Sequence, residues 1–312
     1  MLKVGVIGVG SMGKNHVRVL SELQDVKLIG ISDKDKKTLN KISKKYDVEG
    51  FLDYKELLKR ELDAVSIVVP TTLHKKITLD CIENGIKNIL LEKPIADSVE
   101  SGEEIVRICK EKNVRLMVGH IERFNPAVRK IKELIKNEKI YSIDITRVGP
   151  KPPRIKDVGV VVDMGIHDID LIRYLTGSEI KDVKWFVSSE NGGREDNSEI
   201  IFKLENGTLA HITTNWLTPL KIRKIEIATK NKFIRGDFIE QSVVEYIRYS
   251  QKNNSNKTYL QKRPFANHEE PLKNEIKEFI KSIKESKKSP MSGKDALEAL
   301  KIAESVARKN NI

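Results

Sequence analysis

The first 120 residues alternate between short apolar runs and longer amphipathic stretches. The apolar runs predict strands at Lys3–Gly8, Lys27–Ser32, Ala64–Val69, Asn88–Leu91 and Arg115–Val118. A further short element is expected near Phe51. Apolar residues at helical spacing predict helices between them, at Met12–Leu23, Lys36–Tyr46, Tyr54–Arg60, Leu73–Asn84 and Val99–Lys112. Apolar strands separated by helices indicate a parallel sheet that is covered on both faces.

The pattern changes after Pro126, where the regular alternation stops. From Val183 to Tyr259 the chain shows successive strand patterns with hairpin signals such as Glu205-Asn206-Gly207, which predict an antiparallel sheet. Around this sheet the spacing predicts one more strand and several helices: a strand at Ile140–Arg147, and helices at Ala127–Asn137, from about Val162, at Leu272–Glu285 and at Asp295–Lys309.

The length of 312 residues exceeds the usual size of one domain, which is about 100–200 residues. Because the pattern changes near residue 120, we expect two domains, at residues 1–120 and 121–312. The predicted fold class is α/β. A doubly wound parallel sheet comes first, and an α/β domain with an open, mainly antiparallel sheet follows it.

The charge balance raises the question of a nucleic-acid partner. With 57 Lys and Arg against 45 Asp and Glu, the net charge is +12. The lysines are interspersed with acidic residues, however, and the aromatic residues, 5% of the chain, do not alternate with basic ones as in a base-stacking surface. We expect no nucleic-acid partner, and a surface that tolerates an anionic small ligand.

The apolar runs and the cysteines indicate a cytoplasmic protein. The longest apolar runs have the length of strands, far below the ~18 residues of a membrane span. Met1-Leu2-Lys3 leads directly into a strand pattern rather than a signal peptide. Cys81 and Cys109 fall on apolar helix faces, without metal-ligand spacing, and are expected to be packed thiols in a reducing compartment. We expect no membrane partner and no metal site.

A glycine-rich turn follows the first predicted strand. Gly8-Val9-Gly10-Ser11-Met12-Gly13 has the form G-x-G-x-x-G and opens a helix, where glycines let the backbone approach a pyrophosphate. Asp33 ends the second strand, 20 residues beyond Gly13, where a carboxylate can bind ribose hydroxyls. The pattern predicts an NAD-binding Rossmann domain, with these residues at the cofactor: Gly8, Gly10, Ser11, Met12, Gly13 and Asp33. The neighbouring Lys34 and Lys36 keep NADP open as the alternative.

Other candidate cofactor residues follow the fourth strand. In a doubly wound sheet, the carboxyl ends of the strands line the ligand crevice. Pro70, Thr71 and His74 come directly after this strand and are therefore candidate cofactor-binding residues. Thr71 and Thr72 equally fit a cap of the next helix, and we expect His74 to be structural rather than catalytic.

Glu92 and Lys93 follow the strand Asn88–Leu91 with no polar loop before them. Buried charge is costly unless it is paired or used. Because the strand ends there, we expect both residues at the cofactor, with Lys93 donating toward a substrate hydroxyl that becomes a carbonyl. Taken alone, the two residues fit better as a Glu–Lys pair at a sheet edge.

Asp163 and His167 are four residues apart and are expected on one face of a helix. Oxidation of a secondary alcohol by hydride transfer needs a base for the hydroxyl proton, and imidazole is matched to neutral pH. Asp163 would orient His167 or the substrate. Such a pair alone is more often a cap or a core hydrogen bond. Its combination with Lys93 and the glycine turn indicates a dehydrogenase.

These motifs together resemble the glucose–fructose oxidoreductase, inositol dehydrogenase and MocA family over nearly the full chain. Besides the glycine turn, the resemblance rests on these stretches: Pro70…His74, Glu92-Lys93-Pro94, Arg123-Phe124-Asn125-Pro126, Asp163…His167…Asp170 with Tyr174-Leu175-Thr176-Gly177, and Gly293-Lys294-Asp295-Ala296-Leu297. It implies a Rossmann domain plus an α/β domain whose open sheet assembles a homodimer or homotetramer. It also implies that Lys93, Asp163 and His167 are the catalytic residues.

Three further stretches resemble the UDP-N-acetylglucosamine 3-dehydrogenase group of this family: Gly119–Pro126, Arg147–Pro150 with Pro153-Arg154, and Asn215–Pro219. This resemblance implies oxidation of the sugar 3-hydroxyl of a nucleotide sugar to a ketone. The candidate substrate-binding residues are then His120, Arg123, Arg154, Asp163 and His167. Arg123, Arg154 and Arg263 are candidates for a diphosphate, and ordinary surface arginines explain them equally well. The alternatives are a dehydrogenase of another sugar or an inositol-like polyol, and an NAD-binding regulator without turnover.

Overall fold

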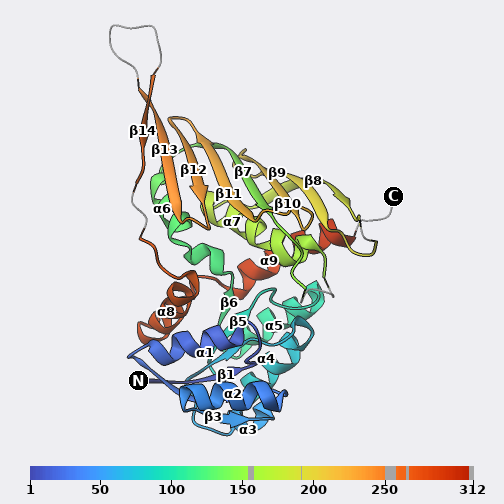
Figure 1. The fold of residues 1–312 in the computed structure, drawn as a ribbon, viewed down its shortest axis with the longest axis vertical. Helices are drawn as coiled ribbons and strands as arrows, with labels where there is room; N and C mark the ends of the chain where they lie inside the picture. Colours follow the sequence, from blue (N-terminus) through green and yellow to red (C-terminus); the bar gives the residue numbers. More distant parts are fainter. Residues whose placement is uncertain (154–157, 191, 250–257, 265–266, 309–312) are drawn as a thin grey trace. The chain divides into compact units, whose positions relative to one another are not determined.

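The computed structural model describes residues 1–153, 158–190, 192–249, 258–264 and 267–308 (Figure 1). The chain forms two compact units. The first contains Met1–Ile121 and Leu272–Lys301, and the second contains Glu122–Pro271 with the residues from Ile302 onward. Residues 272–301 therefore lie in the first unit, and not in the domain 121–312 that the sequence predicts.

The first unit is built on a six-stranded parallel sheet. Its strands, in the order β3-β2-β1-β4-β5-β6, are β3 (Glu49–Phe51), β2 (Val26–Ser32), β1 (Leu2–Ile7), β4 (Ala64–Ile67), β5 (Asn88–Glu92) and β6 (Arg115–Gly119). The connecting helices are α1 (Gly13–Glu22), α2 (Lys36–Tyr46), α3 (Tyr54–Leu58), α4 (His74–Glu83) and α5 (Val99–Glu111). All residues of β4 are buried, so both sheet faces are covered. This strand order is that of the dinucleotide-binding fold, and the prediction of a doubly wound sheet is confirmed.

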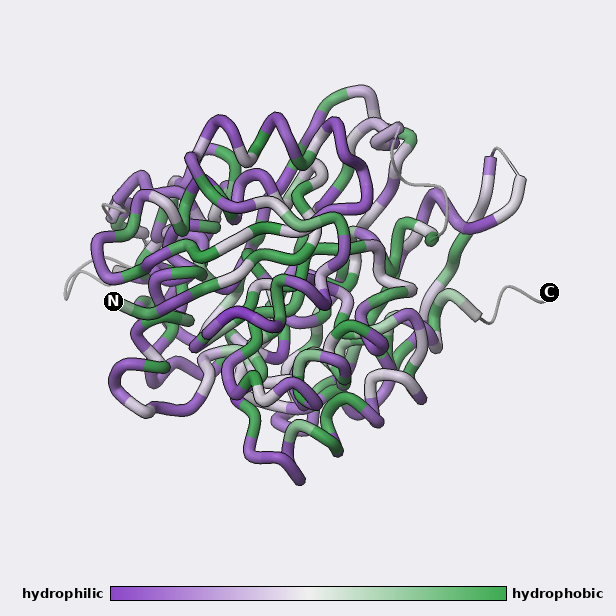
Figure 2. The backbone as a smooth tube through the Cα atoms, turned by 90° about the horizontal axis from the view of Figure 1, so that it is seen from below, coloured by the Kyte–Doolittle hydropathy of each residue, from purple (hydrophilic) through white to green (hydrophobic). Residues whose placement is uncertain are grey.

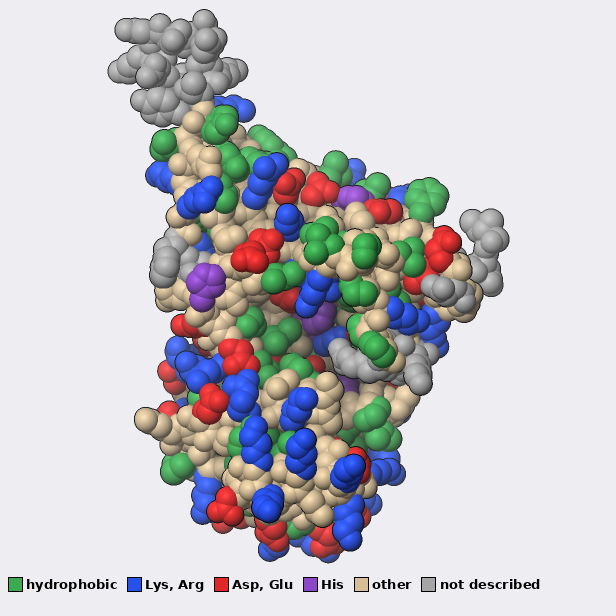
Figure 3. Space-filling model, viewed as in Figure 1, with side chains coloured by type: hydrophobic (Ala, Val, Ile, Leu, Met, Phe, Trp, Pro, Cys, Tyr) green, Lys and Arg blue, Asp and Glu red, His purple; other side chains and the backbone are tan. Residues whose placement is uncertain are grey.

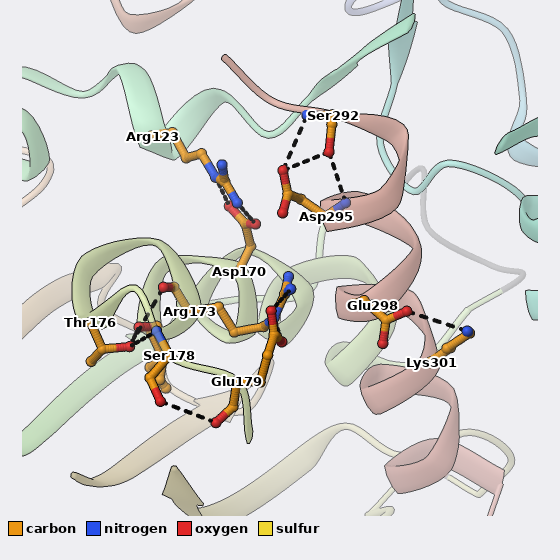
Figure 4. Close-up of polar contacts among 11 residues, drawn as sticks. Arg123, Asp170, Arg173, Thr176, Ser178, Glu179, Ser292, Asp295, Glu298 and Lys301 are labelled. Carbon is orange, nitrogen blue, oxygen red and sulfur yellow. Dashed lines mark hydrogen bonds and ion pairs between the residues drawn. The ribbon is translucent and has the colours of Figure 1, made fainter. Parts of the chain in front are cut away.

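Two C-terminal segments belong to this unit and contact its helices and strands. Helix α8 (Pro271–Lys284) places Lys273 2.9 Å from Glu22, and Ser292 forms a β-bridge with Met117 of β6. Helix α9 (Gly293–Arg308) begins with a reciprocal cap, in which the Ser292 hydroxyl donates to Asp295 at 2.7 Å and accepts from its amide at 3.2 Å (Figure 4).

The second unit contains an eight-stranded sheet in the order β14-β13-β12-β11-β7-β10-β9-β8. Its strands are β7 (Ile140–Val148), β8 (Ile180–Ser188), β9 (Asn197–Leu204), β10 (Leu209–Asn215), β11 (Ile222–Thr229), β12 (Lys232–Asp237), β13 (Ser242–Tyr249) and β14 (Thr258–Lys262). The expected hairpin at Glu205-Asn206-Gly207 joins β9 to β10. Neighbouring strands are antiparallel except β7 and β10, which run parallel, so the sheet is mixed.

Burial alternates along the central strands of this sheet, as in β9 and β10. One face is covered by helices, and α6 (Pro126–Leu134) packs so closely that a Cβ added to Gly236 would lie 2.6 Å from Ile131. The other face exposes large apolar side chains: Phe186, Ile201 and Leu209. Figure 2 shows hydrophobic and hydrophilic residues in short stretches that follow one another along the backbone.

The charges on the surface are mixed, as the sequence predicts. Lys and Arg side chains lie among Asp and Glu side chains on the face seen in Figure 3. Within the described part of the chain, no helix combines the length and the apolar character that a membrane span requires. Cys81 and Cys109 are free and buried, as expected, and burial raises the pKa of both thiols, that of Cys109 to about 12.

Candidate active site

The glycine turn between β1 and α1 has the geometry of a pyrophosphate cradle. Gly8 has φ +89°, and a Cβ there would lie 2.2 Å from the Val68 carbonyl oxygen. A Cβ on Gly13 would lie 2.0 Å from the Gly8 carbonyl oxygen, whereas one on Gly10 would meet nothing within 4 Å. Met12, the residue before α1, makes no side-chain cap, and the positive end of the helix dipole favours an anion at this position.

Asp33 lies beside this turn at the end of β2. Its carboxylate accepts hydrogen bonds from the amides of Val9, at 2.8 Å, and Asp35, at 2.9 Å. The side chain therefore supports the glycine turn, in addition to standing where a carboxylate binds a ribose. Lys34 and Lys36 are exposed. The predicted residues Gly8 to Gly13 and Asp33 thus come together, and they fit an NAD molecule.

The segment after β4 does not cap α4, which was one of the two roles expected for Thr71 and Thr72. Thr71 to Leu73 form a 3-10 turn, and the residue that precedes α4 is Leu73, which makes no side-chain cap. Thr71 and Thr72 are therefore not the cap of α4, and their contact with a cofactor, like that of Pro70, stays a prediction. The buried ring of His74 lies 2.9 Å from the Pro94 carbonyl oxygen and 3.0 Å from that of Val69, which fits the expected structural role, and its contact with a cofactor stays a prediction. Burial lowers the pKa of His74.

Glu92 at the end of β5 is paired inside the first unit. His16 of α1 is fully buried, with Nδ1 2.9 Å from the Ser66 hydroxyl and Nε2 3.0 Å from the Glu92 carboxylate. Glu92 also accepts from the amide of Lys93 at 3.1 Å. Although burial opposes the charge, the hydrogen bond from His16 holds the pKa of Glu92 below its usual value. The sequence analysis did not identify His16 as the partner of Glu92. Its position as a polar residue on the apolar face of α1 could have indicated a buried hydrogen bond.

Lys93 is half-buried, follows β5 and forms a cis peptide with Pro94. It belongs to the first unit, as does His120, which is buried at the end of β6. Asp163 and His167 belong to the second unit. Joint action of Lys93 with these two residues is a proposal, which we take up below.

A buried carboxyl group accompanies the pair of His16 and Glu92. Glu275 of α8 is fully buried, and neither of its oxygens has a hydrogen-bond partner among the described residues. Ligand atoms of His16, Glu92 and Glu275 all lie within 4.8 Å of one another, so these residues form the group that could hold a cation in the described part of the chain. Burial, together with the charge of Glu92, raises the pKa of Glu275 well above its usual value. Burial therefore favours the protonated form of Glu275 over the ionised form.

Replacing Glu275 with glutamine is expected to make the protein more stable at high pH. The native state binds the Glu275 proton more tightly than the unfolded state, so this group lowers stability as pH rises above the unfolded pKa. Glutamine has the same shape and no proton to lose. Between about pH 5 and about pH 8, the melting temperature of the wild type should therefore fall relative to that of the variant, by roughly 2–4 °C for each kcal/mol of proton linkage.

The matched control is Glu278→Gln, which removes a half-exposed carboxyl from the same helix. Its melting temperature should follow that of the wild type at both pH values. If E275Q and the wild type have equal pH slopes, Glu275 is ionised in the folded protein. If added Zn²⁺ raises the melting temperature of the wild type but not of E275Q, the three side chains bind a cation instead of sharing a proton.

Asp163 and His167 lie in one segment of the second unit, as the sequence predicts, but the segment is not a regular α-helix. Asp163 is in a π-helical turn, Val161–Gly165, and His167 is in the first turn of α7 (Ile166–Thr176). Glu195 fixes the start of this turn, because its carbonyl accepts from the Val160 amide at 3.0 Å and its carboxylate from the Val161 amide at 3.3 Å. Asp163 and His167 are both half-buried. Wide turns of this kind are frequent at functional sites.

Buried ion pairs hold α7 in place. Arg147 of β7 donates to Asp168 at 2.8 Å and to Glu122 at 2.7 Å. Burial disfavours its charge, but the two carboxylates raise the pKa of Arg147 above the usual value. These bonds fix the rotation of α7 and therefore the direction of His167.

Arg123 forms the second buried pair. Its Nε and Nη2 donate to the two oxygens of Asp170, at 2.7 and 2.6 Å (Figure 4). This edge of the Arg123 guanidinium is thus already bound, which does not suit a diphosphate ligand. Of the other diphosphate candidates, Arg263 is exposed, and Arg154 lies outside the described residues.

Two family matches cover most of the chain. Residues 2–120 match the GFO/IDH/MocA oxidoreductase family with an NAD-binding Rossmann fold, and residues 128–235 match the GFO/IDH/MocA C-terminal domain.

Relatives with two different substrates are similar to this chain. UDP-N-acetylglucosamine 3-dehydrogenase from Acidithiobacillus ferrooxidans is 28% identical, over 79% of this chain and 77% of the relative. Myo-inositol 2-dehydrogenase from Thermotoga maritima is 27% identical, over 96% of this chain and 93% of the relative. A solved structure of the Acidithiobacillus enzyme has a TM-score of 0.91 at 25% identity, covering 98% of this chain and 96% of that chain.

Proposed function

Because this chain belongs to the GFO/IDH/MocA oxidoreductase family, we propose that it oxidises the 3-hydroxyl of UDP-N-acetylglucosamine to a ketone with NAD. NAD binding and a sugar or polyol substrate are common to the relatives, and the nucleotide sugar is our own assignment. The observation that carries the proposal is the similarity in fold to the Acidithiobacillus UDP-N-acetylglucosamine 3-dehydrogenase over nearly the whole chain.

We assign the chemistry to three side chains. NAD, when bound, accepts the hydride from the substrate carbon. His167 would take the hydroxyl proton, and Asp163 would orient the imidazole or the substrate. Lys93 would donate a hydrogen bond to the oxygen as it becomes a carbonyl. The buried pair of Arg147 and Asp168 supports this assignment, because it holds the helix that carries His167 in one orientation.

The experiment is a turnover assay with purified protein, NAD and UDP-N-acetylglucosamine, in which the absorbance of reduced cofactor is followed. A sugar aminotransferase with its amino donor is added to remove the keto product, because oxidation to a ketone is unfavourable at equilibrium. Myo-inositol and free N-acetylglucosamine are assayed in parallel. No turnover of the UDP-sugar, even with the trap, would refute the substrate assignment, and turnover of myo-inositol alone would favour the polyol alternative.

We also propose that the open face of the second sheet joins copies of the chain. Phe186, Ile201 and Leu209 expose 82%, 54% and 52% of their surface on neighbouring strands, and exposed apolar groups of this size favour association. Phe186→Lys is expected to reduce the assembly to a smaller species, measured by light scattering after gel filtration. Leu52→Lys, which changes an exposed apolar residue of the first unit, should leave the mass unchanged. Equal masses for F186K and the wild type would refute this interface.

A further inference from the structure

Arg223, at the start of β11, differs in its partners from three other arginines of the second unit, Arg123, Arg147 and Arg173. Its Nη1 donates to the carbonyl oxygens of Val148 and Ile222, and its Nη2 lies 3.2 Å from the sulfur of Met164. All three acceptors are neutral. Across the described residues, no carboxylate lies within ion-pair distance of Arg223, whereas Arg123, Arg147 and Arg173 each have one.

The sheet places this unpaired charge next to another cation. Arg223 lies directly opposite Arg147 in the pairing of β11 with β7, and like charges in this position are destabilising. Asp168 and Glu122 bind Arg147 and compensate its charge, but they bind no atom of Arg223. Burial and the charge of Arg147 lower the pKa of Arg223 to about 10, although the more distant carboxylates of Asp168, Glu122 and Asp163 favour its charge. Arg223 is therefore still a cation at neutral pH. A cation held in such surroundings indicates an anionic partner that comes from outside the chain.

The Nε and Nη2 donors of Arg223 are suited to binding a phosphate. Among the described residues, its Nε makes no hydrogen bond, and the contact of Nη2 with sulfur is weak. Nε and Nη2 form one edge of the guanidinium fork, and Arg123 uses this same edge to bind both oxygens of Asp170. Two parallel donors of this kind bind a phosphate or carboxylate through two oxygens.

The position of Arg223 connects it to the proposed reaction. Met164, which it contacts, directly follows Asp163 in the π-helical turn that leads to His167. We propose that Arg223 binds the diphosphate of the substrate, and that this contact selects a nucleotide sugar over a neutral polyol. The inference rests on the proposed function and deepens it. A neutral polyol would leave the Arg223 charge without a partner, whereas a diphosphate supplies one.

The test measures binding of UDP separately from turnover. Calorimetric titration of the protein with UDP should give a Kd that rises about 10- to 100-fold in Arg223→Gln, because a charge-assisted hydrogen-bond pair is lost. In the turnover assay, the same variant should raise KM for UDP-N-acetylglucosamine by a similar factor and change kcat much less, because the diphosphate does not react. Lys224→Gln is the matched control. It removes an exposed charge from the next position of the same strand and should leave both values near those of the wild type.

Arg223→Lys is a second variant that distinguishes loss of the anion contact from a folding defect. It keeps the positive charge and loses the two parallel donors of the guanidinium group. Its UDP affinity should lie between those of the wild type and R223Q, with a melting temperature near that of the wild type. The inference is overturned if UDP does not bind the wild type, or if UDP binds the wild type and R223Q with equal affinity. Either result holds whatever the turnover assay shows. Binding of UDP that depends on Arg223, without turnover of UDP-N-acetylglucosamine, would uphold the anion site and refute only the proposed substrate.

Discussion

Replacing His167 with asparagine is expected to lower kcat by about a hundred- to ten-thousand-fold, the usual contribution of a positioned general base. Asparagine is similar in size and keeps a polar group on α7, but it cannot accept the hydroxyl proton. The Kd for NAD should stay unchanged, because the glycine turn and Asp33 belong to the first unit. Both quantities can be measured on one preparation, kcat from the absorbance of reduced cofactor and Kd by calorimetric titration.

His211→Asn is the matched control for this variant. His211 also belongs to the second unit, but it lies on β10 and bonds Asp144 at 2.9 Å and Glu199 at 2.8 Å on the open side of the sheet. This substitution should leave kcat close to that of the wild type. If H167N keeps most of the wild-type kcat, His167 is not the base, and Lys93 becomes the first residue to test for that role.

The sequence predicted the first sheet well because strong local signals mark its elements. The helix Lys36–Tyr46 was predicted with the bounds that the structure has, and Asp35 caps it by accepting from the Lys37 amide. Pairing between distant segments leaves no such signal. An amphipathic pattern shows that one face of α8 is buried, but not that this face packs in the first unit. Nor does a strand pattern reveal that β10 pairs in parallel with β7.

The candidate site shows the same division. The glycine turn and Asp33 are close in sequence and were predicted together. His16 and Glu92, 76 residues apart, and Arg123 and Asp170, 47 residues apart, are partners that only the fold reveals. The spacing of Asp163 and His167 predicted one helical face, whereas Glu195 fixes the start of a wider turn from a distant loop. The local periodicity of the sequence cannot predict a contact between residues so far apart in the chain.

Replacing Arg147 with methionine is expected to lower the free energy of unfolding of the second unit by about 3–5 kcal/mol. Methionine fills much of the space, but it leaves the carboxylates of Asp168, which is fully buried, and of Glu122 without their partner. Trp185 and Trp216 are the two tryptophans of the chain, and both belong to this unit. Urea unfolding followed by tryptophan fluorescence therefore reports the change directly.

The pH dependence of this loss identifies its cause. Burial already raises the pKa of Asp168 with Arg147 bound to it, and without Arg147 no hydrogen-bonded cation opposes that rise. The native state of R147M then holds the Asp168 proton more tightly than the unfolded state, so its stability should fall as pH rises above the unfolded pKa of about 3.9. The loss should be larger at about pH 8 than at about pH 5. Arg235→Met, which removes an exposed partner of Glu226, should cost at most about 1 kcal/mol at either pH. An equal loss for R147M at both pH values would show that methionine disturbs packing, and that Asp168 carries no uncompensated charge.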